Sequence, residues 1–236
     1  MQSFIREWSE IQHIVNNKPY DKFVTDVSKL LLTNNYTIIE HKYLSNVQLT
    51  TTTIDMYYCS VRSLQTNVLY VLFPSGIVLT YNDLYNNSEL NTHLMQLIHT
   101  LSNNKEQRFV LGGHSMGCVL ALYTGFLMHR MPLFNRCFIV GTAGAKWIPG
   151  SFDYTNYDNI QVFISGSKQR KSMVLDSFLT KGDANLVAYT PITVLYCDTK
   201  TNVATQIPYD SIGCNITYSE KLHDWNYYKK LINLAL

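Results

Sequence analysis

The amino-acid sequence predicts a single α/β domain in which helices flank a mostly parallel β-sheet. Short apolar runs that suit strands buried on both faces alternate with longer stretches of helical periodicity along most of the chain. The 236 residues, with 46% hydrophobic side chains, suffice for one sizeable core. Because neither an internal repeat nor an interdomain linker divides the sequence, we expect one domain over residues 1–236.

Two amphipathic helices are expected within residues 1–35, where they would pack on the sheet. In the first, apolar residues recur at helical spacing from Phe4 to Val15, and the second ends at Asn34-Asn35. An alternating segment from Thr51 to Ser60 then predicts a half-buried strand at or near an edge of the sheet.

The middle of the chain alternates between buried strands and helices. Val68 to Phe73 is a continuous apolar run that predicts a strand buried on both faces. A helical stripe follows from Leu90 to Leu101, then a short strand from Phe109 to Leu111 and an almost entirely apolar helix from Cys118 to Met128. Further short buried strands are expected at Cys137–Val140, Ile160–Ile164 and Ile192–Tyr196.

Composition excludes several classes of function. A formal charge of +2 is too small for sequence-independent nucleic-acid binding, and nucleotide-loop, zinc-protease and dinucleotide motifs are missing. The basic run Lys168 to Lys171 is interpreted as a solvated loop, with contact to an anionic membrane surface as the alternative. Five widely spaced cysteines and an N-terminus that lacks the features of a secretory signal favour a cytoplasmic protein.

The candidate catalytic nucleophile is Ser115, at the centre of Gly113-His114-Ser115-Met116-Gly117. A predicted strand precedes this pentapeptide and a predicted helix follows it, which is the context of the nucleophile elbow of α/β hydrolases. In that elbow, small residues such as Gly113 and Gly117 let the two backbones pass closely. The new helix directs its positive end at the serine, so the Met116 backbone N–H is a natural oxyanion donor. The alternative is a chance match in a glycine-containing loop.

The surrounding residues carry a family resemblance. A buried strand, the turn Pro74-Ser75-Gly76, a segment containing Asp83, a long helix and the strand into Gly-His-Ser follow one another in order. Residues 68–128 thereby resemble the class 3, or fungal-type, lipase family of α/β hydrolases. Its members usually have Arg-Gly-Thr or Arg-Gly-Ser at the turn, and Leu-Gly-Gly where this chain has Met116-Gly117-Cys118. The resemblance implies a lipid ester as substrate and Ser75 as the second oxyanion donor.

The general base is expected near the C-terminus, because α/β hydrolases present serine, acid and histidine in that chain order. His223 fits this order, and residues 215–236 would form the histidine loop and a terminal helix, as in the family that the chain resembles. The alternative is that His223 merely caps that helix. His114 lies beside the nucleophile and is expected to pack or to line the site.

The acid is expected in the loop after Ile160–Ile164, yet residues 165–171 contain no carboxylate. Asp176 is the first carboxylate downstream and is our choice for the acid, and Asp183 is the second choice. The alternative for Asp176 is a structural position at a helix end or on the surface. The missing carboxylate favours a second hypothesis, a catalytically impaired protein that binds a lipid or protein partner.

The leading prediction is a serine carboxylic-ester hydrolase that forms an acyl-enzyme on Ser115. The serine, the histidine and backbone donors would supply the chemistry, so we expect neither a metal nor an organic cofactor. The expected partner is a lipid or other ester, with possible contact at a lipid surface.

Overall fold

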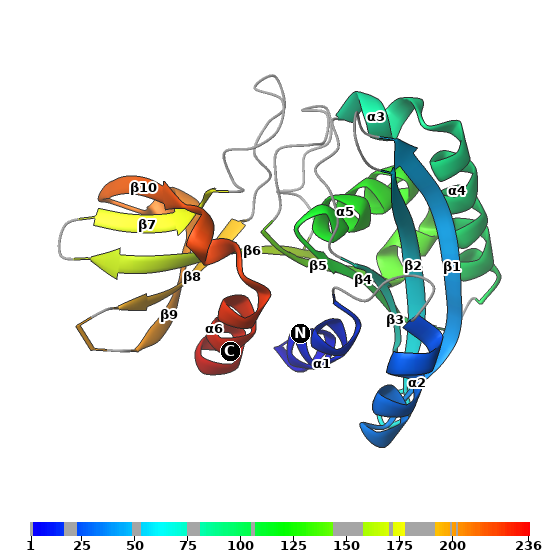
Figure 1. Cartoon of the computed structure of the whole chain (residues 1–236), viewed down its shortest axis with the longest axis horizontal. Coiled ribbons are helices and arrows are strands. Elements are labelled where there is room, and N and C mark those ends of the chain that lie inside the picture. The colour runs from blue at the N-terminus through cyan, green and yellow to red at the C-terminus, as the bar shows by residue number, and fades with distance from the viewer. Residues whose placement is uncertain are drawn as a thin grey trace.

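The structure is a computed structural model, and it describes residues 2–16, 23–48, 53–74, 81–104, 107–143, 158–169, 172–177, 192–198, 200–201 and 203–236. Helices and strands alternate along its central part (Figure 1). The helices are α1 (Gln2–Val15), α2 (Phe23–Thr33), α3 (Tyr81–Asn86), α4 (Ser88–Asn103), α5 (Met116–Met128) and α6 (Trp225–Ala235). The strands are β1 (Tyr36–Gln48), β2 (Thr53–Ser63), β3 (Leu69–Phe73), β4 (Phe109–His114), β5 (Cys137–Thr142), β6 (Ile160–Gln169), β7 (Ser172–Asp176), β8 (Ile192–Asp198), β9 (Ala204–Pro208) and β10 (Asn215–Ser219).

All these strands belong to one sheet. Its main path is β1-β2-β3-β4-β5-β6-β7-β10, and β8 pairs with both β6 and β9. The strands β3 to β6 are mutually parallel, as are the pairs β6–β8 and β7–β10, whereas antiparallel pairing occurs at β1–β2–β3, β6–β7 and β8–β9. The prediction of one domain with a mostly parallel sheet flanked by helices is therefore confirmed.

The helices form layers on the two faces of the sheet. Successive residues of β4 point to opposite faces, as in any strand. A Cβ at Gly112 would lie 2.1 Å from Trp8 of α1, whereas a Cβ at Gly113 would lie 2.2 Å from the backbone of Gly117 in α5. Helix α1 thus covers one face of the central strands and α5 covers the other. Helix α6 lies beside α1, so the two ends of the chain meet on one face (Figure 1).

The predicted helices and buried strands are present, but four further strands went unpredicted. The strand β1 carries two register shifts, between Ile38 and Glu40 and between Tyr43 and Ser45. Each shift interrupts the alternation of apolar and polar residues that identifies a strand in a sequence. The strands β7, β9 and β10 are each five residues long, too short for a clear periodic signal. The expected edge or near-edge strand is β2, which has β1 outside it.

The segment after Ile164 is also different from the prediction. It was expected to be a loop, but β6 continues to Gln169 and pairs with β7 through Gly166–Gln169. Lys168 is accordingly a strand residue, with its Nζ atom 5.8 Å from the ring centre of Tyr196. No helix in the described part of the chain is long and apolar enough to cross a membrane.

Candidate active site

Ser115 lies at a sharp bend between the end of β4 and the start of α5. Its backbone has φ 56° and ψ −121°, a positive-φ conformation that residues other than glycine rarely adopt. A backbone hydrogen bond from Ser115 N to the Thr142 carbonyl oxygen, 2.9 Å long, ties the bend to β5. The side chain is therefore held in one place above the carboxyl end of the sheet, as the predicted elbow requires.

Two glycines make the bend possible by allowing backbones to touch. A Cβ on Gly113 would lie 2.2 Å from the Gly117 carbonyl carbon, and a Cβ on Gly117 would lie 2.0 Å from the Phe73 carbonyl oxygen. Both distances are below any van der Waals contact with backbone atoms that cannot move aside. The strands β3 and β4 and the first turn of α5 can approach one another only because these positions lack side chains.

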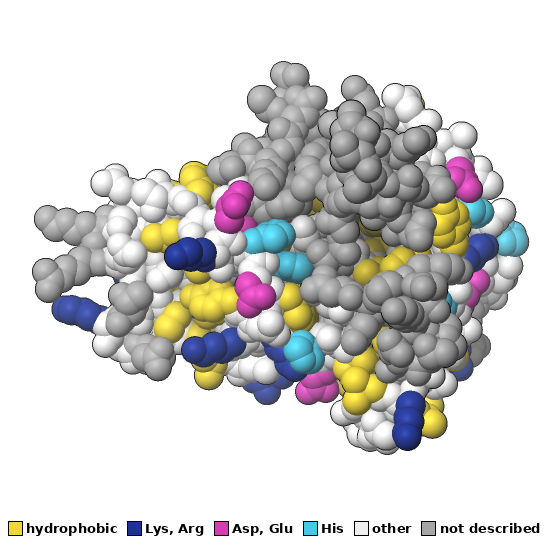
Figure 2. Space-filling view, viewed as in Figure 1, with side chains coloured by type: hydrophobic (Ala, Val, Ile, Leu, Met, Phe, Trp, Pro, Cys, Tyr) yellow, Lys and Arg dark blue, Asp and Glu magenta, His cyan; other side chains and the backbone are white. Residues whose placement is uncertain are grey.

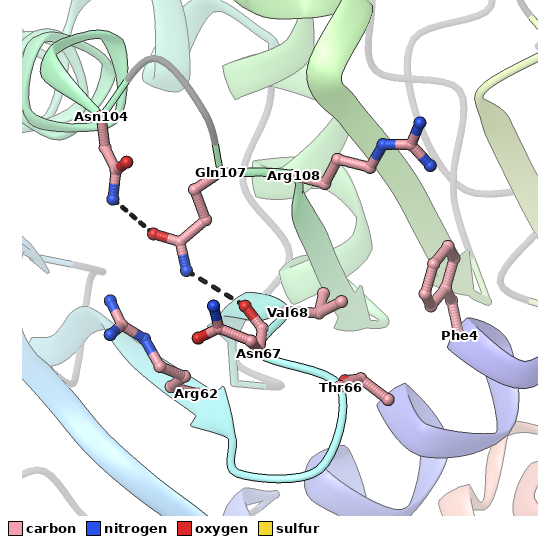
Figure 3. A pocket seen from close by; sticks show the side chains of 8 residues that line it. All are labelled: Phe4, Arg62, Thr66, Asn67, Val68, Asn104, Gln107 and Arg108. Carbon is pink, nitrogen blue, oxygen red and sulfur yellow. Dashed lines mark hydrogen bonds between the residues drawn. The ribbon is translucent and has the colours of Figure 1, made fainter.

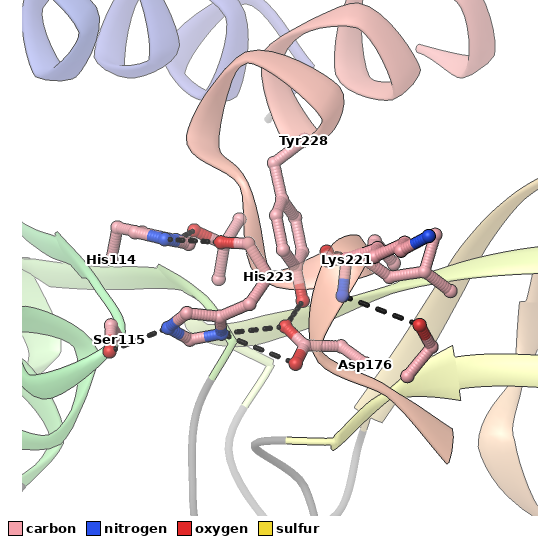
Figure 4. A network of polar contacts seen from close by, with 10 residues as sticks. His114, Ser115, Asp176, Lys221, His223 and Tyr228 are labelled. Atoms are coloured by element: carbon pink, nitrogen blue, oxygen red, sulfur yellow. Dashed lines mark hydrogen bonds and ion pairs between the residues drawn. The ribbon is translucent and has the colours of Figure 1, made fainter.

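The imidazole of His223 bridges Ser115 and Asp176 (Figure 4). Its Nε2 atom is 2.9 Å from Ser115 Oγ, and its Nδ1 atom is 2.9 Å from Asp176 Oδ2 and 3.2 Å from Oδ1. An ionised carboxylate can only accept, so Nδ1 carries the proton and Nε2 is left to accept from the serine hydroxyl. The three residues span 108 positions of the sequence, from Ser115 to His223, and form a hydrogen-bonded line that is suited to drawing the proton from Ser115.

The acid reaches His223 through an additional hairpin. From Ile160, β6 runs past the point where the acid was expected, and β7, which is antiparallel to β6, ends at Asp176. The strand β10 pairs in parallel with β7, so that Ser219 lies opposite Asp176, and the 3-10 helix η5 (Glu220–His223) begins at the next residue. Asp176, at the end of β7, and His223, just after the end of β10, therefore lie at the same end of two neighbouring parallel strands.

Asp176 is fully buried, and besides His223 it is hydrogen-bonded by Tyr228 of α6. The Tyr228 hydroxyl donates to Asp176 Oδ2 over 2.7 Å, and its ring, too, is fully buried. Burial, followed by the charge of Asp176, raises the pKa of Tyr228 well above its usual value, so the phenol remains a donor. A carboxylate buried with two donors is a structural part of the site, which differs from the helix-end or surface position considered as the alternative.

His114, next to Ser115 in the sequence, is hydrogen-bonded to the backbone of His223. One ring nitrogen, Nδ1, is 2.9 Å from Thr142 Oγ1, and the other, Nε2, is 3.1 Å from the carbonyl oxygen of His223. Because a carbonyl only accepts, Nε2 carries the proton. Burial, and then the nearby His223, lower the pKa of His114 to about 3, so its ring is neutral at physiological pH. Its predicted packing role is confirmed, and its hydrogen bond to the backbone carbonyl of His223 is an addition.

The segment that carries His223 is fixed at further points. The Ser165 hydroxyl of β6 donates to the Leu222 carbonyl oxygen, and the Tyr227 hydroxyl donates to the Gly166 carbonyl oxygen over 3.0 Å. The cap of α6 is Asp224, whose side chain accepts from the Tyr227 backbone N–H. His223 is consequently free of the capping role that was its alternative.

One of the two predicted oxyanion donors lies within the described residues. Met116 is the first residue of α5, so its backbone N–H has no carbonyl one turn earlier in the helix to bond. Ser75 lies outside the described residues, as does Asp183, the second choice for the acid. Pro74, the residue before Ser75, is placed against Gly117, since its carbonyl oxygen is 3.0 Å from the position of a Cβ there.

Sequence reasoning brought Ser115, His223 and Asp176 forward and missed Tyr228. A tyrosine in an aromatic-rich helix carries no pattern that indicates a bond to a carboxylate, and its position five residues after His223 could not be converted into a contact without the fold. Among the described residues no group of three or more His, Cys, Asp or Glu side chains could hold a metal ion.

The sequence matches no family model and no curated protein. The structure is similar to solved structures of fungal proteins. It resembles a mutant of MDLA from Penicillium cyclopium (13% identity, TM-score 0.63, covering 96% of this chain and 97% of that one) and the Rhizomucor miehei lipase propeptide complex (14%, 0.62, 94% and 80%). It also resembles the lipase of Rhizopus microsporus var. chinensis (14%, 0.55, 92% and 85%). At these identities the comparison shows a fungal-lipase-like α/β-hydrolase fold.

Proposed function

We propose that this chain is a serine hydrolase that cleaves carboxylic esters through an acyl-enzyme on Ser115. The observation that carries the proposal is the unbroken hydrogen-bonded line from Ser115 Oγ through His223 to Asp176. These side chains come from three separate parts of the sequence, and each is held by its own backbone contacts. Such an arrangement activates a serine hydroxyl, which is otherwise a poor nucleophile.

The geometry supports the following sequence of steps. Ser115 Oγ attacks the ester carbonyl carbon while its proton passes to His223 Nε2, and Asp176 stabilises the resulting imidazolium. The Met116 N–H donates a hydrogen bond to the carbonyl oxygen as negative charge develops on it, and Ser75 is our proposed second donor. His223 then returns the proton to the departing alcohol oxygen. A water molecule, deprotonated by His223, releases the acid and restores Ser115.

A lipid ester is the proposed substrate class. Its support is the likeness to proteins named as lipases, together with the resemblance of residues 68–128 to the fungal-type lipase family. On the face shown in Figure 2, the described Lys and Arg side chains are dispersed, with Asp and Glu side chains between them. This distribution suits an uncharged substrate better than a polyanion.

The non-catalytic alternative loses its main argument. It depended on the missing carboxylate after Ile164, and Asp176 supplies that carboxylate from the end of β7. A protein that only bound a ligand would have no need of a buried acid in contact with both His223 and Tyr228.

A fluorophosphonate label tests the proposal directly. We expect covalent attachment at Ser115, complete loss in Ser115→Ala, and labelling slowed by at least about a hundredfold in His223→Ala. Chromogenic esters of increasing acyl length then rank the substrates, and preference for long chains is expected. Absence of labelling in the folded wild-type chain would refute the hydrolase, whereas activity confined to short chains would refute the lipid ester alone.

A further inference from the structure

A hollow lies at the opposite end of the sheet from Ser115. It occupies about 580 Å³ near the amino ends of β3 and β4, between Arg62 of β2 and Arg108, the residue before β4 (Figure 3). Ser115 follows the other end of β4, so this hollow is separate from the candidate active site. Its volume lies in the range of small-molecule sites.

Arg62 is the residue that points to an anionic ligand. It is partly buried, its Nε atom is fully enclosed without a hydrogen-bond partner, and the guanidinium forms neither an ion pair nor a hydrogen bond with any described residue. Enclosing a charged donor without an acceptor is costly, and a guanidinium presents its N–H groups in pairs that match two oxygens of one anion. An anion beside Arg62 would supply the missing partner.

Every formal charge among the described lining residues is positive. Arg108 is exposed and, like Arg62, forms no ion pair with a described residue, and none of the described lining residues is a carboxylate. The nearest acid connected to the lining by a hydrogen bond is Glu7, which accepts from the hydroxyls of Thr66 and Tyr70. Both donors are neutral hydroxyls, and Glu7 forms no ion pair with either arginine among the described residues.

The wall of the hollow is held in place by its own contacts. Asn104 Nδ2 donates to Gln107 Oε1 over 2.5 Å, and Gln107 Nε2 donates to the Asn67 carbonyl oxygen over 3.4 Å (Figure 3). Arg136, which comes from outside the hollow, donates to the carbonyl oxygens of Asn104 and Gln107. This third arginine holds the wall and is not available to the ligand, so a ligand would enter a preformed site.

We propose that this hollow binds a small phosphomonoester, with its phosphate against Arg62 and its organic part directed along Val68 toward Phe4. A phosphate offers three terminal oxygens, enough for the paired N–H groups of Arg62 and for the side-chain amide of Asn67 beside it, whereas a carboxylate offers two. Val68 and Phe4 supply an apolar surface beyond the phosphate. Arg108, at the opposite end of the hollow from Arg62, adds electrostatic attraction for the anionic ligand.

Titration calorimetry with phenyl phosphate on the full chain tests this proposal. We expect saturable binding with 1:1 stoichiometry, weakened at least about tenfold in Arg62→Gln, because a charge-assisted hydrogen-bonded pair is lost. The Arg108→Gln variant, at an exposed side chain, is expected to bind about threefold more weakly. Arg130→Gln, an exposed arginine outside the lining, is the matched control and should bind like the wild type.

Two further ligands and one further variant separate the possible results. Inorganic phosphate should bind at the same site with lower affinity, since it lacks the organic part, and phenylacetate should bind more weakly than phenyl phosphate. Ser115→Ala should bind phenyl phosphate unchanged, so loss of hydrolase activity has no bearing on this site. The proposal is overturned by no saturable binding below about 10 mM, by equal affinity in Arg62→Gln, or by phenylacetate binding as tightly as the phosphate.

Discussion

His114 shows how a buried residue beside Ser115 can link acid stability to the candidate active site. Its pKa is lowered to about 3 by burial and by the neighbouring His223, whereas in the unfolded chain it returns to about 6.5. Between these values the unfolded chain binds a proton that the folded chain does not. The contribution of His114 to stability is therefore complete above about pH 6.5 and is lost as the pH falls toward 3.

We accordingly expect the free energy of unfolding to fall by about 1.4 kcal/mol per pH unit on account of His114 between about pH 6 and pH 4. Urea unfolding at several pH values, with the wild type and His114→Gln compared, measures this slope. Burial also lowers the pKa of His13 and His41, but both remain in the variant and cancel in the difference. Parallel curves for the two proteins would contradict the assignment.

Tyr228 gives a prediction about activity. In Tyr228→Phe the buried Asp176 Oδ2 loses a 2.7 Å hydrogen bond and retains His223 as its partner. We expect kcat on a soluble ester to fall about tenfold with KM little changed, and stability to fall by about 1–3 kcal/mol, because a buried acceptor loses a donor.

Tyr227→Phe is the matched control for this change. The Tyr227 hydroxyl donates to the Gly166 carbonyl oxygen and contacts neither Asp176 nor Ser115 in the described hydrogen bonds. Its loss should reduce stability by about 1 kcal/mol and leave kcat within about twofold. Equal effects of the two variants on kcat would show that Tyr228 acts only through packing.

How far the sequence predicts the site depends on how local each signal is. Ser115 is identified by a five-residue pattern between a strand and a helix, and His223 by its place in the chain order. Asp176 required a choice between two carboxylates, because the hairpin that returns it to His223 consists of a continued β6 and a five-residue β7. Hydrogen bonds from Tyr228 and His114 depend on how distant elements pack, which no short pattern records.

The elbow, as an element, depends on the close contact of three backbones. In Gly117→Ala the new Cβ would lie 2.0 Å from the Phe73 carbonyl oxygen, so β3 and α5 must move apart. We expect a loss of stability of about 3 kcal/mol or more and loss of fluorophosphonate labelling, since Ser115 and the Met116 N–H move with the helix.

Gly213→Ala provides the comparison for this change. A Cβ there has no neighbour within 4 Å, so the same substitution should leave stability within about 0.5 kcal/mol and leave labelling intact. Thermal unfolding and labelling of both variants decide the matter. A stable, fully labelled Gly117→Ala variant would mean that the two backbones are farther apart than the structure places them.

In the whole molecule, the two ends of the chain meet beneath His223. Trp8 of α1 packs edge to face on Trp225 of α6, with ring centres 5.7 Å apart, and the Trp225 indole N–H donates to His13 Nδ1. Trp8 also covers Gly112 in β4, two residues before His114. The N-terminal helix, predicted from the sequence as an amphipathic helix that packs on the sheet, thus supports both β4, which leads to Ser115, and α6, which follows His223.

Replacing Trp8 tests whether that support matters for catalysis. Trp8 is fully buried, so Trp8→Ala leaves a large cavity, and we expect the free energy of unfolding to fall by about 3–5 kcal/mol. Because the cavity borders both Trp225 and β4, the distance from His223 to Ser115 should become variable and kcat should fall several-fold below the unfolding temperature. Leu30→Ala, at a side chain 48% exposed, is the control, with little change in either quantity. If Trp8→Ala unfolds more easily yet retains full kcat while folded, α1 contributes stability alone, and the positions of Ser115 and His223 are set entirely by β4, β10 and their hydrogen bonds.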